Sequence, residues 1–298
     1  MKRSVIITLT ALAVAVLGSI PAQGAPTGIS GLAASASGTS VTVTGSVAFG
    51  GEDRVEVGTD AVNDNLGGAQ TAPLGLDIQS MSISQPNPAS PVLEFVLDLS
   101  AMTADGIPEH VAYNWDVAVN GGAAQGGSNY SIKTWRTQVR STTNANPYAA
   151  IFTCQPQPPP QTGYTCSPSS TVTAVYDGPN SQIRLSVPLA GIDAAPGSTI
   201  EGWDRIAGHV YVGGTAGTQT LAGLYDEANH GEYTVPTKDV KVGIAPAGGA
   251  ISYATPASLS GNSFSGTLSA AGPGSYDVGA RACFGANCAT ATTTVTVG

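Results

Sequence analysis

Apolar and polar residues alternate with a period of two along much of this 298-residue chain, and no long stretch shows a helical period. Such alternation places apolar side chains on one face of a strand and polar side chains on the other. The pattern is clear in residues 41–49, 93–99, 113–119, 172–187 and 276–284. Frequent Gly and Pro supply turns between short strands. The sequence therefore predicts an all-β chain, with antiparallel sheets that form a β-sandwich.

Two segments give more specific expectations. Asp177-Gly178-Pro179-Asn180 is a turn sequence between two alternating runs, so it predicts a β-hairpin. The segment 76–84 breaks the alternation, because its apolar residues occupy both even and odd positions and would therefore point to both faces of a strand. Either a bulge or a strand buried on both faces would explain that segment, and the sequence does not choose between them.

A domain boundary is expected near Val235-Pro236-Thr237. Residues 213–232 upstream look like a long irregular stretch, whereas four strand-like runs follow the boundary. The downstream part is smaller than the ~100 residues of an antibody domain, so it suits a small immunoglobulin-like sandwich. The predicted organisation is a signal peptide (1–24), a β-sandwich (25–235) and a small immunoglobulin-like β-sandwich (236–298).

The first residues have the features of a secretory signal peptide. Lys2 and Arg3 precede an apolar run from Val5 to Leu17, which is shorter than the ~20 residues that a membrane span requires. Small residues around Ala22-Gln23-Gly24 predict cleavage after Gly24. No later apolar run reaches ~18 residues, so we expect no membrane span after cleavage. The predicted location is secreted and extracellular.

Charge excludes one class of partner. The chain has 20 acidic and 11 basic residues, a net charge of −9. Nucleic-acid binding depends on basic contacts to phosphates, so it is not expected here.

Four cysteines, Cys154, Cys166, Cys283 and Cys288, suit an exported chain with two disulfides. Three pairings exist in principle. Pairing of sequence neighbours is the most economical, because each pair brackets a short turn-like segment. Cys154–Cys166 would close a Pro-rich loop, and Cys283–Cys288 would clasp a hairpin around Gly285. A metal site is the weaker alternative, because no C-x-x-C motif and no nearby His occur.

Several short motifs resemble known families. The stretch 60–67, rich in Asp and Asn, precedes Leu76-Asp77-Ile78, and Leu185-Ser-Val-Pro-Leu-Ala-Gly-Ile192 precedes Pro196-Gly197. Together they resemble DOMON-like domains and family 9 carbohydrate-binding modules over residues 29–235. The resemblance implies a β-sandwich in which an acidic loop leads into a strand. The last sixty or so residues resemble immunoglobulin-like or PKD-type modules of secreted bacterial proteins.

No catalytic motif is present, so we predict that the chain is not an enzyme. Neither G-x-S-x-G nor H-E-x-x-H occurs, and there are only three histidines, His110, His209 and His230. Some DOMON-like domains bind haem through Met and His, and Met81 and Met102 supply the other ligand type. Nothing in the sequence marks a pair, so haem rests on that resemblance alone.

Calcium is a candidate cofactor. Asp60, Asn63, Asp64 and Asp77 gather in and after one loop, and hard oxygen ligands of this kind suit Ca²⁺. Their spacing does not match an EF-hand. The alternative is an Asx-rich turn in which these side chains bind their own backbone.

A candidate ligand site lies in residues 130–140. This strand is polar on both faces and contains Tyr130, Lys133, Trp135 and Arg136, which combine flat rings with charged groups as sugar-binding sites do. A polar, charged strand is also typical of a sheet edge protected against aggregation, and that interpretation is favoured. Trp115, in contrast, lies on an apolar face and is expected in the core.

The function predicted from the sequence is a secreted, non-catalytic binding protein whose ligand is a cell-surface or environmental polysaccharide. The first alternative is a structural protein that contacts other proteins through the Pro-rich loop 155–164 and the C-terminal module. The second is a haem- or metal-dependent enzyme or electron carrier.

Overall fold

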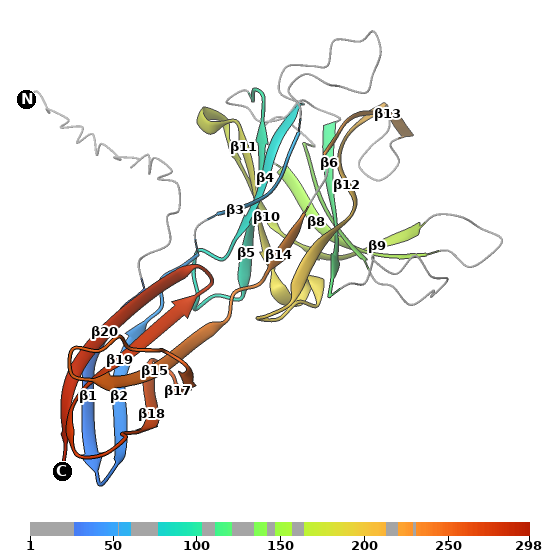
Figure 1. Ribbon diagram of the computed structural model, residues 1–298. Coiled ribbons are helices and arrows are strands. Elements are labelled where there is room, and N and C mark those ends of the chain that lie inside the picture. Colours follow the sequence, from blue (N-terminus) through green and yellow to red (C-terminus); the bar gives the residue numbers. More distant parts are fainter. Residues whose placement is uncertain are drawn as a thin grey trace, which may run out of the picture.

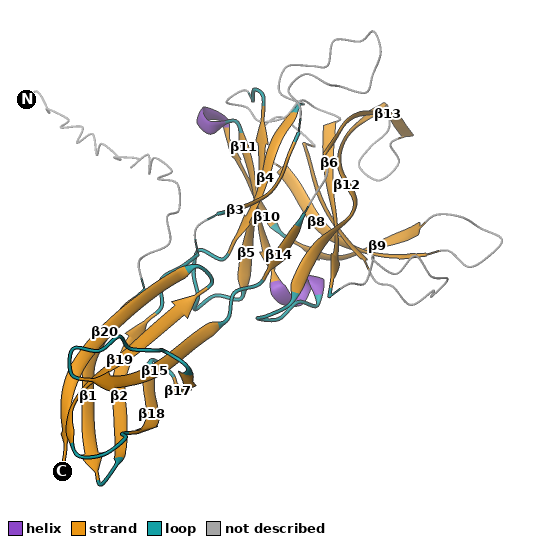
Figure 2. Ribbon diagram, in the orientation of Figure 1, coloured by secondary structure: helices purple, strands orange, loops and turns teal. Residues whose placement is uncertain are grey.

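The computed structural model describes residues 27–52, 54–60, 77–102, 111–120, 134–141, 147–156, 164–212, 220–228 and 231–298. This part of the chain is all-β, as predicted, with antiparallel sheets and two short 3-10 helices (Figures 1 and 2). None of its helices is both long and apolar enough to cross a membrane. The strands form two β-sandwich domains, at the upper right and the lower left of Figure 1.

The larger domain, here called the inserted domain, spans residues 55–234 and has two sheets. One sheet has the order β10-β11-β5-β4-β3, formed by β3 Val55–Thr59, β4 Ile78–Ser84, β5 Val92–Leu99, β10 Thr173–Asp177 and β11 Gln182–Pro188. The other has the order β13-β12-β6-β7-β8-β9, with β14 on β12. Its strands are β6 Val111–Val119, β7 Thr134–Ser141, β8 Pro147–Pro156, β9 Tyr164–Thr171, β12 Thr199–Val212, β13 Thr220–Ala228 and β14 Glu232–Thr234. The helices η1 Gly178–Asn180 and η2 Leu189–Ile192 follow β10 and β11.

The core of the inserted domain lies between these two sheets. Phe95 of β5 and Trp115 of β6 pack against each other across it, with ring centroids 4.8 Å apart. Trp115 is 1% exposed, so its predicted place in the core is confirmed. The predicted hairpin around residues 177–180 is also confirmed, because β10 and β11 pair on either side of η1.

The irregular segment 76–84 contains β4, and both explanations apply to it. The register between β4 and β5 shifts between Ile78 and Ser80, which marks a bulge or irregularity. Beyond that point Met81, Ser82 and Ile83 are all buried, although they alternate between the two faces. The lost alternation therefore reflects a bulged strand that is covered on both sides.

The smaller domain, here called the discontinuous domain, combines residues 28–48 with residues 238–297. One sheet has the order β1-β2-β18-β17, formed by β1 Gly28–Ser37, β2 Ser40–Ala48, β17 Ser258–Ser260 and β18 Ser263–Ser269. The other has the order β16-β15-β19-β20, formed by β15 Lys238–Pro246, β16 Thr255–Pro256, β19 Gly274–Phe284 and β20 Asn287–Val297. Val43, Phe264 and Val278 are among the residues that form the core between them.

This arrangement corrects the expected domain limits. Residues 28–48 do not belong to the sheets of the inserted domain, because β2 pairs with β18 from Ser40 opposite Ser269 to Ser46 opposite Ser263. The inserted domain therefore interrupts the smaller sandwich instead of preceding it. The stretch 213–232 is also less irregular than expected, since it contains β13 and the start of β14.

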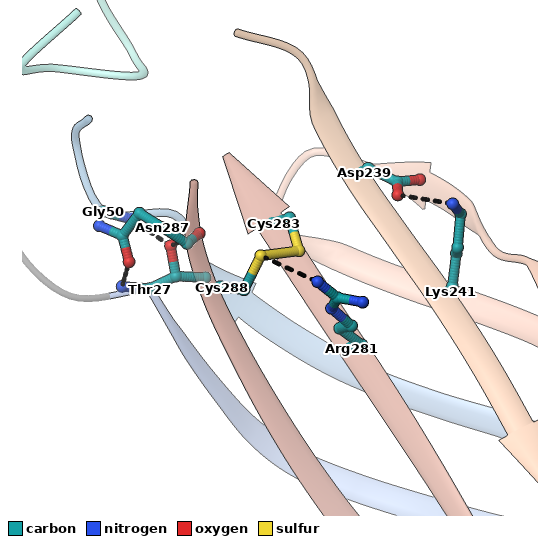
Figure 3. Close-up of a disulfide and its surroundings, with 8 residues drawn as sticks. All are labelled: Thr27, Gly50, Asp239, Lys241, Arg281, Cys283, Asn287 and Cys288. Carbon is teal, nitrogen blue, oxygen red and sulfur yellow. Dashed lines mark hydrogen bonds and ion pairs between the residues drawn. A yellow bond between two sulfur atoms is a disulfide. The ribbon is translucent and has the colours of Figure 1, made fainter. Parts of the chain in front are cut away.

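The chain crosses between the domains twice, through residues 49–54 and 235–237. The tip of the β19–β20 hairpin meets the first crossing (Figure 3). Asn287 donates its Nδ2 hydrogen to Gly51 O at 2.8 Å, and its Oδ1 accepts from Thr27 N–H at 3.1 Å. A side chain at Gly51 would overlap the backbone of Pro86, so close packing at this crossing requires glycine.

Glu52 extends this junction toward the inserted domain. Its carboxylate accepts a hydrogen bond from Tyr233 Oη at 2.5 Å, and its side chain packs against Gly285 at the hairpin tip. Both Glu52 and Tyr233 are buried. Burial raises the pKa of Tyr233, and the neighbouring Glu52 carboxylate raises it further.

Both predicted disulfides are confirmed. Cys283 and Cys288 lie directly opposite each other on β19 and β20, and the turn between these strands contains Gly285 with φ of 59°. Cys154 and Cys166 join β8 to β9 in the same way. Residues 157–163 of the Pro-rich loop lie outside the described residues.

Candidate functional site

The predicted ligand strand is only partly described. Tyr130 and Lys133 lie outside the described residues, whereas Trp135 and Arg136 belong to β7. β7 pairs with β6 on one side and β8 on the other, so the prediction of a sheet edge is wrong. Register sets Trp135 opposite Val117 of β6 and Thr153 of β8.

The predicted calcium loop is described only at its two ends. Asn63 and Asp64 lie outside the described residues. Asp60 and Asp77 lie near the same end of β3 and β4, where Asp60 N–H donates to Gln79 O at 3.0 Å. The described residues hold no group of three or more His, Cys, Asp or Glu that could bind a metal. Calcium binding by this loop therefore remains a prediction.

Charged residues on the outer face of the β10-β11-β5-β4-β3 sheet bind one another. Arg184 Nη2 donates to Asp177 Oδ2 at 2.8 Å, and Arg54 Nη2 donates to Glu94 Oε2 at 3.2 Å. All four side chains are less than a fifth exposed. A network that satisfies its own charges in this way stabilises the sheet surface and leaves little for a ligand.

Hydroxyl groups cover most of the outer face of the sheet β1-β2-β18-β17. We call this surface the hydroxyl face. Its exposed residues are Ser30, Ser35, Ser37, Ser40, Thr42, Thr44, Ser46, Ser258, Ser260, Ser263, Ser265, Thr267 and Ser269. None of the four strands contains Asp, Glu, Lys, Arg or His.

Strand register arranges these hydroxyls in rows. Thr42 of β2 lies between Ser35 of β1 and Thr267 of β18. Adjacent strands are ~4.8 Å apart, and residues on one face of a strand repeat every ~6.7 Å. The result is a grid of groups that each donate one hydrogen bond and accept two.

Buried residues pack closely beneath this face. Phe264 of β18 lies across Gly45 of β2, where a Cβ would come within 2.6 Å of the ring. Gly266 approaches the second sheet so closely that a Cβ there would be 2.6 Å from Val242 Cγ2. The strands therefore alternate large or absent side chains inward with small hydroxyl side chains outward.

The hydroxyl face can bind but offers no acid–base pair for catalysis. Its sequence signal is visible in residues 41–47 and 263–269, where Ser or Thr occupies every outward position. The two segments are more than two hundred residues apart. Sequence reasoning missed the face because it assigned them to different domains.

Comparisons with known proteins give no further guidance. No protein-family model, curated protein or solved structure matches the chain.

Proposed function

We propose that this chain is an exported, non-catalytic protein that binds a neutral polysaccharide through its hydroxyl face. The observation that carries the proposal is a four-stranded surface of exposed Ser and Thr without a single charged side chain. The leader-like first residues and the two disulfides support an extracellular location.

The physical properties of the face favour a polymer over a small molecule. Small ligands require concave sites that bury most of their surface, whereas these hydroxyls lie on the outer face of a four-stranded sheet. A polysaccharide presents repeating hydroxyls, so a grid of hydroxyls can form many hydrogen bonds to one chain. Each bond contributes only about 0.5–1.5 kcal/mol, and affinity therefore depends on their number. Ser and Thr also lose little rotamer entropy on binding, and an uncharged face avoids the cost of desolvating ions.

The proposal is tested by retention of the purified protein on a panel of insoluble neutral polysaccharides. The test variant carries Thr42→Val, Thr44→Val and Thr267→Val, which remove three central hydroxyls and keep the side-chain shape. The control carries Thr292→Val, Thr294→Val and Thr296→Val, at exposed positions of β20 on the other sheet. We expect the test variant to bind roughly tenfold more weakly or worse, and the control to bind as the wild type does. Equal retention of both variants, or no retention of the wild type on any polysaccharide, would reject the proposal.

A further inference from the structure

A pocket of about 580 Å³ lies beside the junction of the two domains, on the outer face of the β16-β15-β19-β20 sheet. Its floor includes residues of β15 and β19 and the Cys283–Cys288 disulfide, and residues 234–237 of the second crossing form another side. The volume lies in the range of small-molecule sites. The hydroxyl face belongs to the other sheet of the same domain, so the two surfaces are separate.

Two glycines that face each other on this sheet position Tyr253, which lines the pocket. Gly243 of β15 pairs with Gly279 of β19. A side chain at position 243 would overlap the backbone of Ser252, and a Cβ at position 279 would lie 2.9 Å from the ring and hydroxyl of Tyr253. Because both positions lack a side chain, the loop that contains Ser252 and Tyr253 can lie directly on the sheet. Tyr253 is thereby brought to the pocket.

Two cations, Lys241 and Arg281, and two carboxylates, Asp239 and Glu52, line the pocket, and Glu52 accepts a hydrogen bond from Tyr233. Lys241 and Arg281 are directly opposite each other on β15 and β19, and like charges in that position repel. Lys241 Nζ lies 3.4 Å from Asp239 Oδ2, which compensates one of the two cations. Figure 3 shows this pair beside Arg281, whose guanidinium points toward the disulfide.

Arg281 has no acidic partner among the described residues. Its Nη2 lies 3.7 Å from Cys288 Sγ, a weak acceptor, and its side chain is exposed. Arg54 and Arg184, in contrast, both pair with carboxylates. Asp239 pairs with Lys241 and Glu52 binds Tyr233, so among the described residues Arg281 is left to bind an external anion.

We propose that this pocket binds a sugar acid, with its carboxylate held by Arg281 and Lys241. A guanidinium presents two parallel N–H groups that match the two oxygens of a carboxylate. The Asp239 and Glu52 carboxylates and the Tyr253 hydroxyl also line the pocket, and they suit the hydroxyls of a sugar ring. This inference does not depend on the hydroxyl face, so either proposal can fail without the other.

Isothermal titration of the purified protein with glucuronate tests the inference. We expect saturable binding to one site that weakens as salt is added. Arg281→Gln should lower the affinity about ten- to a hundredfold, because charge-assisted hydrogen bonds are lost. Lys238→Gln is the matched control, since it removes one exposed cation from the start of β15 outside this pocket, and it should leave the affinity unchanged. Thermal midpoints verify that both variants are folded.

Three further arms identify the ligand chemistry. Glucose should not bind measurably, because it lacks the anion, and Arg281→Lys should bind glucuronate more weakly than wild type, because it lacks the planar fork. Inorganic phosphate should bind more weakly than glucuronate. Phosphate binding as tightly as glucuronate would overturn the sugar part of the proposal. Absence of glucuronate binding, or equal loss in Arg281→Gln and Lys238→Gln, would overturn the site.

Discussion

Individual contacts decide where this protein tolerates change. Gly266 is a clear example, because a Cβ at this position would lie 2.6 Å from Val242 Cγ2 on the facing sheet. Gly272 has no atom within 4 Å of the same virtual Cβ and does not adopt a positive φ. The same Gly→Ala change therefore meets a close contact at position 266 and open space at position 272. Comparing the two variants separates the cost of the contact from the effect of alanine on backbone entropy.

Gly266→Ala should destabilise the protein by about 1–3 kcal/mol, because the extra methyl forces β18 and β15 apart. Gly272→Ala should be neutral or stabilise the fold by up to about 1 kcal/mol, because it restricts only the unfolded chain. Chemical denaturation of both variants measures the two free energies of unfolding. Equal stability of the two variants would show that the sheets do not approach each other as closely as described.

Tyr233 gives the molecule a pH-dependent contact. Its pKa is raised by burial and by its hydrogen bond to Glu52, so the folded protein keeps the phenol protonated where the unfolded chain ionises it. The stabilisation is therefore complete below about pH 10, the pKa of an exposed tyrosine, and is lost as the pH rises further.

We expect the free energy of unfolding to fall above about pH 10, by up to about 1.4 kcal/mol per pH unit for this tyrosine. Tyr233→Phe should be less stable at neutral pH, because Glu52 loses a buried donor, and its stability should fall less steeply in alkali. Denaturation series at several pH values measure both slopes. Identical slopes for the two proteins would exclude Tyr233 as the source.

Among the strands, the β19–β20 hairpin has the most varied role. Its tip binds the first crossing through Asn287, supports Glu52 at Gly285, and carries a disulfide that lines the proposed pocket. Cys288 is exposed, whereas Cys154 of the other disulfide is 2% exposed. Thiol–disulfide exchange needs access to a sulfur, and a nearby cation such as Arg281 stabilises the departing thiolate.

A mild thiol reagent should therefore reduce Cys283–Cys288 before Cys154–Cys166. Alkylation at timed intervals followed by peptide mass spectrometry measures each rate within the same sample. Arg281→Gln should slow reduction of the first disulfide and leave the second unchanged. Faster reduction of Cys154–Cys166 would contradict the assigned difference in exposure.

The sequence predicted where the strands lie better than it predicted which strands pair. Period-two alternation located strands such as β5 and β19, because each has one buried and one polar face. It misjudged β7, since a strand with polar residues on both faces looks like an edge, yet β7 lies between β6 and β8. Side-chain polarity reports burial along one strand and does not report which strands pair.

At the level of the whole molecule, topology was the hardest feature to predict. A chain that leaves a sandwich after β2 and returns at β15 contains no local signal of that return, because β2 and β18 each look like ordinary half-buried strands. The disulfides were predictable, since both close short local segments. The hydroxyl face was not predictable, because it forms only when strands from the first and last parts of the chain pair with each other.

This topology also gives the molecule two separate surfaces for ligands. The hydroxyl face covers one sheet of the discontinuous domain, and the pocket around Arg281 lies against the other sheet beside the inserted domain. An uncharged sheet surface and a concave, charged pocket suit ligands of different size and charge. The inserted domain adds a side to the pocket, because Gly197 and Thr234, the last residue of β14, line it together with residues 235–237 of the second crossing.

The most direct test of polysaccharide binding is the map of backbone amide chemical shifts when a soluble oligosaccharide of the retained polymer is added to isotope-labelled protein. We predict perturbed amides in β1, β2, β17 and β18, centred on Thr42 and Thr267, and unchanged amides in β20. Perturbations confined to β7, to residues 60–77 or to the pocket around Arg281 would place the ligand elsewhere and contradict the hydroxyl face as the binding surface.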